Sequence, residues 1–199
     1  MYYIYGMGKI RSAWEIALER TDNIEIDAEK IRHKETIDKI RRAAGAFLIA
    51  EDKDEESLRN SLKDFNGQDI KEALKSSVIN GLSLPQEEVK DDRYDRLQCL
   101  LDTALNDENA DALFSQIVAF LKQYPLHKKQ LIDQLKAQAE PMLREKEEKI
   151  KNQYGEDVHL SLENDKEFLN ILDQNLKRLD DQYNQTLDGA KAQLETLFS

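Results

Sequence analysis

The three histidines are the first candidates for chemistry in this chain, because imidazole can bind metals and transfer protons near neutral pH. They are His33, His127 and His159, far apart and without an HxxxH or HExxH motif. Glu156 and His159 form one ExxH pair, whereas a ferritin-like carboxylate site needs two such pairs and two further glutamates. The sequence therefore predicts no metal site, and we interpret His159 as a solvent-facing residue in a connection between helices.

A calcium loop and the common phosphate motifs are also excluded. Asp52, Asp54 and Glu56 have the spacing of the first ligands of a calcium loop, but Ser57 replaces the required glycine and Lys63 the bidentate glutamate. No GxxxxGK[ST], GxGxxG or GxSxG motif occurs, so neither a phosphate cradle nor a nucleophile elbow is expected. We predict no catalytic residue and no cofactor, and we do not expect an enzyme.

Cys99 is the only cysteine, and it lies among apolar residues in RLQCLLDTAL. It cannot form an internal disulfide, so we predict a buried, inert thiol and a reducing compartment. No run approaches the roughly 20 apolar residues that span a bilayer, and the N-terminus lacks the basic region of a secretory signal. These features predict a cytoplasmic protein without a transmembrane segment.

The charge balance argues against nucleic-acid binding. Lys and Arg number 29 against 40 Asp and Glu, giving a formal net charge of -11, which repels a phosphate backbone. Basic residues cluster once, without interleaved aromatic residues that could stack on bases. This cluster is either a solvated helix face or a patch for an acidic protein partner; it comprises Lys30, Arg32, His33, Lys34, Lys39, Arg41 and Arg42.

The first two thirds of the chain have the apolar spacing of short helices. We expect helices over about 9–20, 27–50, around 58–65, around 70–79, from 83–85 to about 105, and 109–124. Thr21-Asp22-Asn23 is expected to end the first helix, Asn80-Gly81 to form a left-handed cap, and Pro125 to end the last.

The last third predicts two long helices. One extends from residue 126 to about 154 with a kink or break at Pro141, and the other begins after Asn164 or Asp165 and reaches about 197. The apolar positions of the final helix follow a coiled-coil seam with one four-residue step. These positions are Leu169, Leu172, Leu176, Leu179, Tyr183, Leu187, Ala190, Leu194 and Leu197. The two helices should form an antiparallel hairpin.

The predicted fold is therefore all-α: a cluster of short helices over about 9–124 and a long C-terminal antiparallel hairpin. We predict two domains, 1–125 and 126–199, the second coiled-coil-like. Residues 23–27 and 158–162 both alternate apolar and polar residues, so one minor two-strand pairing is also possible.

Two stretches carry a family resemblance: KIRSAWEIALERT near the N-terminus, and LREKEEKIKNQYG followed by EFLNILDQNLKRLDDQYNQTL near the C-terminus. They resemble a bacterial family of helical proteins of unknown function. The resemblance implies neither an activity nor any site residues.

The leading functional hypothesis is a non-enzymatic helical protein that binds another protein or a second copy of itself. The expected contact residues are Trp14 in the N-terminal amphipathic helix and Leu176, Leu179 and Tyr183 in the hairpin. The alternative is a ligand-binding or enzymatic domain with a pocket in the 28–124 cluster and Arg41, Arg42 or Asp102 at its mouth. A third reading makes the REKEEK segment of the hairpin a stalk-like lever in a larger assembly.

Overall fold

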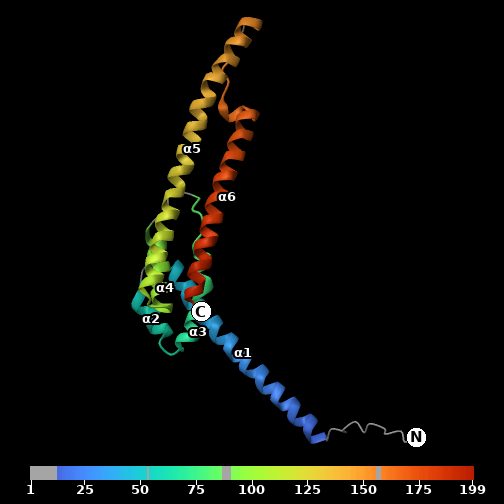
Figure 1. Ribbon diagram of the computed structural model, residues 1–199, viewed down its shortest axis with the longest axis vertical. Helices are drawn as coiled ribbons and strands as arrows, with labels where there is room; N and C mark the ends of the chain where they lie inside the picture. The colour runs from blue at the N-terminus through green and yellow to red at the C-terminus, as the bar shows by residue number, and fades with distance from the viewer. Residues whose placement is uncertain (1–12, 53, 87–90, 156–157) are drawn as a thin grey trace, which may run out of the picture.

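The computed structural model describes residues 13–52, 54–86, 91–155 and 158–199, with side chains described from Ala28 onward except that of Asp91. Its helices are α1 (Ala13–Ile49), α2 (Glu55–Leu62), α3 (Gly67–Gly81), α4 (Asp91–Ala104), α5 (Glu108–Tyr154), the 3-10 turn η1 (Leu162–Asn164) and α6 (Lys166–Leu197). This confirms the all-α fold. Figure 1 shows a helical bundle from which α5 and α6 project at one end and α1 at the other.

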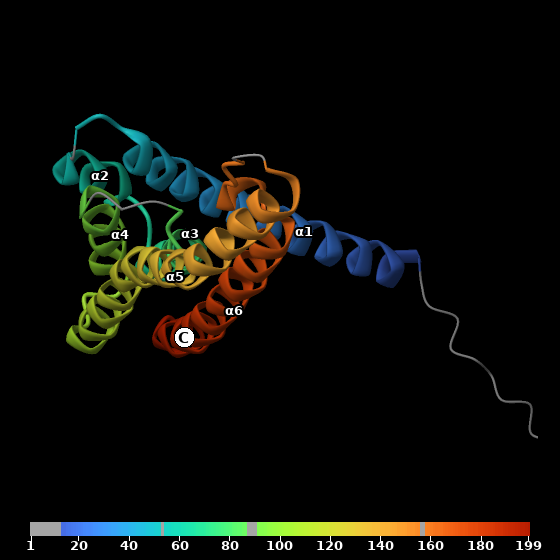
Figure 2. The same ribbon diagram turned by 90° about the horizontal axis from the view of Figure 1, so that it is seen from above.

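Helix α4 is the centre of the bundle, because its apolar residues face neighbours on almost every side. Tyr94, Leu97, Cys99, Leu100 and Leu101 are all buried. Helix α4 packs on α3 and α5, and α1 packs chiefly on α3 (Figure 2). Cys99 is buried as predicted, and burial raises the pKa of its thiol.

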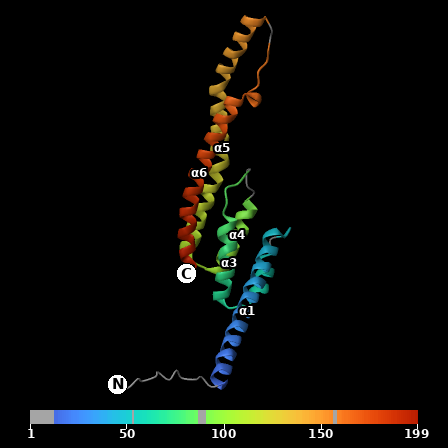
Figure 3. The same ribbon diagram turned by 90° about the vertical axis from the view of Figure 1, so that its right-hand side faces the viewer.

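The hairpin and the bundle share one core. Leu187, Leu194 and Phe198, near the end of α6, are buried in the same cluster as the residues of α1, α3 and α4. Helix α5 contributes Phe114, Ile117 and Leu121 to this cluster and then continues into the hairpin (Figure 3). The predicted domain boundary at 125 therefore falls inside a helix that both parts share.

Helix α5 passes through both Pro125 and Pro141, so the expected helix end at Pro125 and the break at Pro141 are wrong. A proline inside a helix removes one hydrogen bond and costs about 3 kcal/mol. Packing on both sides of each proline offsets this cost, since α5 is anchored in the bundle before Pro125 and lies along α6 after it.

Helix α1 is also longer than predicted. The helices expected over 9–20 and 27–50 form one helix, so Thr21-Asp22-Asn23 does not end it and Asp27 does not cap a new one. These polar residues weaken a helix only slightly, and residues 21–27 contain no glycine or proline. Residues 23–27 lie in this helix and no strand occurs among the described residues, so the two-strand pairing is wrong.

Two local signals near the hairpin turn are confirmed. Gly155 has a left-handed conformation with φ of 69°, and its N–H donates to the carbonyl of Lys151. Asp165 caps α6 by accepting from the backbone N–H groups of Glu167 and Phe168. Near α4 the start expected at 83–85 is too early, because α4 begins at Asp91.

Gly81 does not form the left-handed cap that we predicted, because α3 continues through it and ends in the extended residue Leu82. Its role is steric. A Cβ at position 81 would overlap the buried side chain of Leu97 on α4. Gly81 therefore allows α3 and α4 to approach closely.

Replacing Gly81 with alanine should lower the free energy of unfolding by about 1 kcal/mol, since overpacking against Leu97 outweighs the gain in helix propensity. Gly189 in α6 is the matched control, because nothing lies within 4 Å of a Cβ there. Gly189→Ala should raise the stability by up to about 1 kcal/mol. Urea unfolding of both variants measures the difference, and equal effects would contradict the steric role.

Candidate interaction site on the helical hairpin

A cluster of aromatic rings fixes α5 against α6 where the hairpin leaves the bundle. Tyr183 is buried, stacks on Phe120 with ring centroids 4.6 Å apart, and meets Tyr124 edge-on at 5.1 Å. Its hydroxyl lies 2.5 Å from Nδ1 of His127, and the Tyr124 hydroxyl donates to Asp180 at 2.6 Å. Such directional contacts fix the register of two helices in a way that aliphatic packing alone does not.

The tyrosine hydroxyls of this cluster stay protonated over the physiological range. Burial, together with the hydrogen bond to Asp180, raises the pKa of Tyr124 to about 12. Burial also raises the pKa of Tyr183. Both hydroxyls therefore serve as structural hydrogen-bonding groups, and neither has the lowered pKa of a catalytic phenol.

Beyond this cluster the hairpin has little enclosed core. We call residues 126–154 of α5 and 162–179 of α6 the distal hairpin. Phe168 is the only buried side chain among its described residues. The other apolar residues along the α5–α6 contact are half-buried: Leu131, Ile132, Leu135, Ala139, Leu143, Ile150, Leu172, Leu176 and Leu179. The distal hairpin is therefore a two-helix structure with an incompletely covered seam.

Large apolar side chains also lie on the outside of the distal hairpin. Leu126, Met142, Tyr154, Leu169 and Ile171 are all exposed, and Met142 retains 61% of its accessible surface. Over the whole described chain, Ile31 and Ile49 of α1 are the only other large hydrophobic residues with this degree of exposure. These five residues are spread along the length of the distal hairpin, so most of the large exposed apolar residues of the described chain belong to it.

Charged groups close the distal end. Lys146 donates to Asp165 at 2.9 Å and reaches Glu167 at 3.5 Å, while Glu147 accepts the backbone N–H of Leu160. The contact with Lys146 lowers the pKa of Asp165 and raises that of Lys146. His159 is fully exposed and lies 3.8 Å from Glu147, which confirms it as a solvent-facing residue.

The four predicted contact residues have different positions. Leu176 and Leu179 are half-buried on α6 in the distal hairpin. Tyr183 is buried inside the chain, so its ring is already occupied by α5. Trp14 belongs to α1, but its side chain lies outside the described residues. The exposed residues Met142 and Ile171 were not among those predicted; Ile171 falls one position before the seam residue Leu172.

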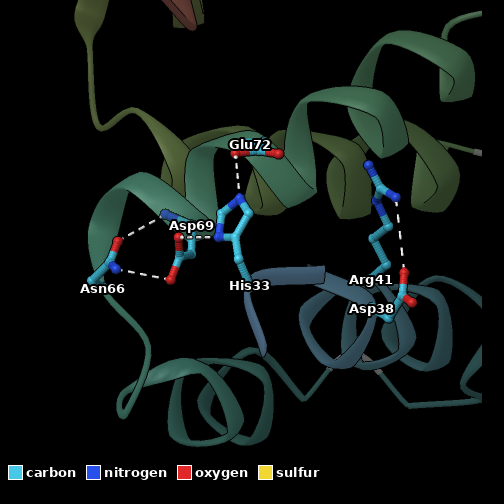
Figure 4. A network of polar contacts seen from close by, with 6 residues as sticks. All are labelled: His33, Asp38, Arg41, Asn66, Asp69 and Glu72. Carbon is cyan, nitrogen blue, oxygen red and sulfur yellow. Dashed lines mark hydrogen bonds and ion pairs between the residues drawn. The ribbon is translucent and has the colours of Figure 1, made fainter. Parts of the chain in front are cut away.

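One residue of the basic cluster of α1, His33, contacts α3. Nδ1 of His33 lies 3.4 Å from Asp69, and Nε2 lies 3.2 Å from Glu72 (Figure 4). The two carboxylates are on opposite nitrogens of the ring, so one metal ion could not contact both. Among the described residues no group of three or more His, Cys, Asp or Glu side chains could hold a metal.

An open cavity of about 470 Å³ lies between the ends of α1 and α3 and the start of α4. Leu48, Gly81, Arg93, Arg96 and Leu97 contribute to its lining. The guanidinium of Arg96 is buried and donates to the carbonyl of Phe47, while Arg93 donates to the carbonyl of Gly81. Both arginines therefore bind the C-terminal ends of helices.

The residues expected at a pocket mouth do not line this cavity. Arg41 and Arg42 are exposed on α1. Asp102 is half-buried, and Gln98 bridges it to Asp111 by donating to both carboxylates at 2.8 Å. Burial, and then the neighbouring Asp102 carboxyl, raise the pKa of Asp111.

Asp111→Asn should raise the melting temperature at pH 7. The raised pKa means that ionised Asp111 is disfavoured in the folded state, so stability falls as the pH rises through the folded-state pKa. The advantage of the variant should shrink as the pH falls, because a growing fraction of the Asp111 carboxyl is then protonated. Thermal melting at pH 7 and at lower pH measures it.

The control for Asp111→Asn is Glu108→Gln, which removes another carboxylate from the first turn of α5. This control should lower the melting temperature slightly, because acidic residues stabilise a helix N-terminus. An equal loss of stability in both variants at pH 7 would show that ionised Asp111 does not destabilise the folded state.

Comparison with known proteins gives one match. The model of a family of unknown function, DUF6657, matches residues 59–196, which include the hairpin and most of the bundle. This agrees with the predicted resemblance over the C-terminal stretches, whereas KIRSAWEIALERT lies outside the matched residues. No curated protein and no solved structure matches the chain. Among the described residues no helix is long and apolar enough to cross a membrane.

Proposed function

We propose that this chain, which belongs to the DUF6657 family, is a helical interaction protein that binds a partner protein through its distal hairpin. The observation that carries the proposal is the contrast within the hairpin. Near the bundle Tyr183, Leu187 and Leu194 are buried, whereas every apolar residue of the distal hairpin except Phe168 is half-buried or exposed. A third helix or a sheet face packed along the seam would remove these groups from water.

The rigidity of the hairpin base supports this reading. The contacts of Tyr124 and Tyr183 fix the register of α5 and α6, so the distal seam is already ordered in the absence of a partner. A pre-ordered surface loses less conformational entropy on binding than a flexible one. The absence of a metal-binding group among the described residues is consistent with a role in binding, and it does not by itself exclude catalysis.

The first test compares what co-purifies with the native protein and with a distal variant. Met142→Glu combined with Ile171→Glu introduces two charges at exposed positions, so the fold should be retained. The partner should be lost from the purified material, as measured by quantitative mass spectrometry. Ala192→Glu is the matched control, because Ala192 is exposed on α6 beside the bundle. Equal recovery from both variants would contradict the proposal.

A second copy of the chain could occupy the same seam. In that case Leu176→Asp combined with Leu179→Asp should give a folded monomer in sedimentation analysis, with a smaller mass than the unaltered protein. An unchanged mass for this variant would exclude self-association through α6. Binding of a different protein is tested separately, by the co-purification experiment.

Ligand binding is a second candidate function, and the cavity beside Arg93 and Arg96 is the observation in its favour. It is the weaker candidate, because both arginines already donate to backbone carbonyls. A thermal-shift screen with nucleotides, metals and metabolites tests it, since ligands that bind the native state raise the melting temperature. We also propose a cytoplasmic location, where the buried thiol of Cys99 needs no oxidised partner.

A further inference from the structure

Helix α1 is divided into two halves of opposite charge. Residues 13–29 contain six carboxylates and one arginine, and residues 30–42 contain six lysines and arginines and two carboxylates. The whole of this charge pattern lies on one continuous helix. A helix macrodipole favours such a distribution only within its first and last turns, so the dipole does not account for charges in the middle of α1.

The basic half is exposed and largely unpaired within the chain. Lys30, Arg32, Lys34 and Lys39 are exposed, and in the described part of the chain none of them forms an ion pair. Arg41 reaches Asp38 on its own helix at 4.0 Å (Figure 4). The basic half can therefore pair with carboxylates from outside the chain.

Two large apolar side chains of helix α1 also lie outside its buried face. Its buried face carries Ile37, Ile40, Ala44 and Phe47, which pack into the bundle. Ile31 and Ile49 lie on the opposite side by helical spacing, and they are 58% and 86% exposed. No atom lies within 4 Å of a Cβ built on Gly45, which lies between them on that side. A second helix could approach closely there.

The N-terminal part of α1 extends away from the bundle in Figures 1 and 3. His33 is the first of its described side chains with a polar contact to another helix, and Ile37 is the first that is buried. A projecting helix of this kind gains little stability from propensity alone in water, so packing by a further element is expected.

We propose that α1 pairs with α1 of a second copy in an antiparallel arrangement, with a two-fold axis between residues 29 and 30. This register sets the acidic half of each copy against the basic half of the other. In this register, residues 25–29 of one copy lie at the same level along the pair as residues 30–34 of the other.

The charge pattern favours a second copy of the chain as the binding partner of α1, and it favours the antiparallel orientation. A parallel pair would set like charges against each other, which costs energy and disfavours that arrangement. A second copy supplies both complementary halves at once, and a two-fold interface repeats every favourable pair. The contact is separate from the distal hairpin, so Met142→Glu with Ile171→Glu should leave it unchanged.

Charge reversal tests the proposal. The first variant is Lys30→Glu, Arg32→Glu and Lys34→Glu; the second is Glu25→Lys, Asp27→Lys and Glu29→Lys; the third combines both sets. Lys129→Glu, Lys136→Glu and Lys149→Glu on α5 form the matched control, because these lysines are exposed and the net charge changes as in the first variant. Sedimentation equilibrium measures the mass, and circular dichroism confirms that each variant is folded.

The unaltered protein, the control and the combined variant should be dimers. The first and second variants should each dimerise at least about 100-fold more weakly, and their equimolar mixture should form a heterodimer as tight as the original. Gly45→Gln should also weaken the dimer, whereas Gly189→Gln should not. A monomeric unaltered protein at concentrations on the order of 100 µM would overturn the proposal. Dimers that persist in both single reversals, or a mixture that does not recombine, would also overturn it.

Discussion

Replacing Arg96 with methionine is expected to lower the free energy of unfolding by about 3 kcal/mol, because a buried guanidinium that binds the end of another helix is lost. Arg96 is 5% exposed and donates to the carbonyl of Phe47 at 2.5 Å and to Asp92 at 3.0 Å. Its guanidinium also lies over the Phe47 ring at 5.7 Å. The variant leaves the Phe47 carbonyl, near the C-terminus of α1, without its partner.

The matched control for Arg96→Met is Arg93→Met, one turn earlier on α4. Arg93 also binds a helix end, donating to the Gly81 carbonyl at 2.7 Å, but its side chain is exposed and water can replace it. Its loss should cost about 1 kcal/mol. Urea unfolding at neutral pH measures both, and a loss at Arg96 no larger than that at Arg93 would contradict its role in fixing α1.

Tyr183→Ala should have a comparable or larger effect, about 3–5 kcal/mol, because truncating a buried aromatic residue removes its packing and leaves a cavity. The variant removes the contacts with the rings of Phe120 and Tyr124 and the hydrogen bond with His127. The distal hairpin depends on this cluster for its register. In Tyr183→Ala, amide-proton exchange should therefore accelerate much more in the distal hairpin than in α4.

Tyr183→Phe separates the ring from the hydroxyl. It retains the aromatic packing and loses only the contact with His127, so the free energy of unfolding should fall by about 1 kcal/mol. Hydrogen exchange measured by mass spectrometry follows the hairpin and the bundle separately. Equal acceleration in both would show that the aromatic cluster supports the whole fold and not the hairpin in particular.

The features that the sequence predicts correctly depend on neighbouring residues. Gly155 ends α5 because glycine adopts the left-handed conformation without strain, and Asp165 caps α6 through its own side chain. The seam of α6 is likewise visible from its spacing except at Leu169, which is exposed, and Tyr183 is buried at the four-residue step of that seam. Each of these signals is complete within one or two helical turns.

The structural features that the sequence does not predict depend on contacts between residues far apart in the chain. Pro125 would end an isolated helix, yet α5 continues because both sides of the proline are packed. The partner of Arg96, the carbonyl of Phe47, is 49 residues away in sequence. Its one sequence signal is the spacing to Cys99 and Leu100, three and four residues later, which places Arg96 on a buried side of α4.

The same limit applies to the candidate site. The sequence predicts that the hairpin is a contact surface, but only the structure distinguishes the residues already covered by α5 from those that are exposed. Tyr183 is among the covered residues, whereas Met142 and Ile171 are exposed. The charge division of α1 is present in the sequence, but its meaning depends on the continuity of that helix through residues 21–27.

The most direct measurement of the central claim, that the distal hairpin binds a partner protein, is site-specific photo-crosslinking in the native cell. A photoreactive amino acid is placed at Met142, at Ile171 or, as the control, at Ala192, all of which are exposed. The proposal predicts that both distal positions give a high yield of one crosslinked protein and that position 192 gives little. Low yields at 142 and 171, equal to that at 192, would contradict it.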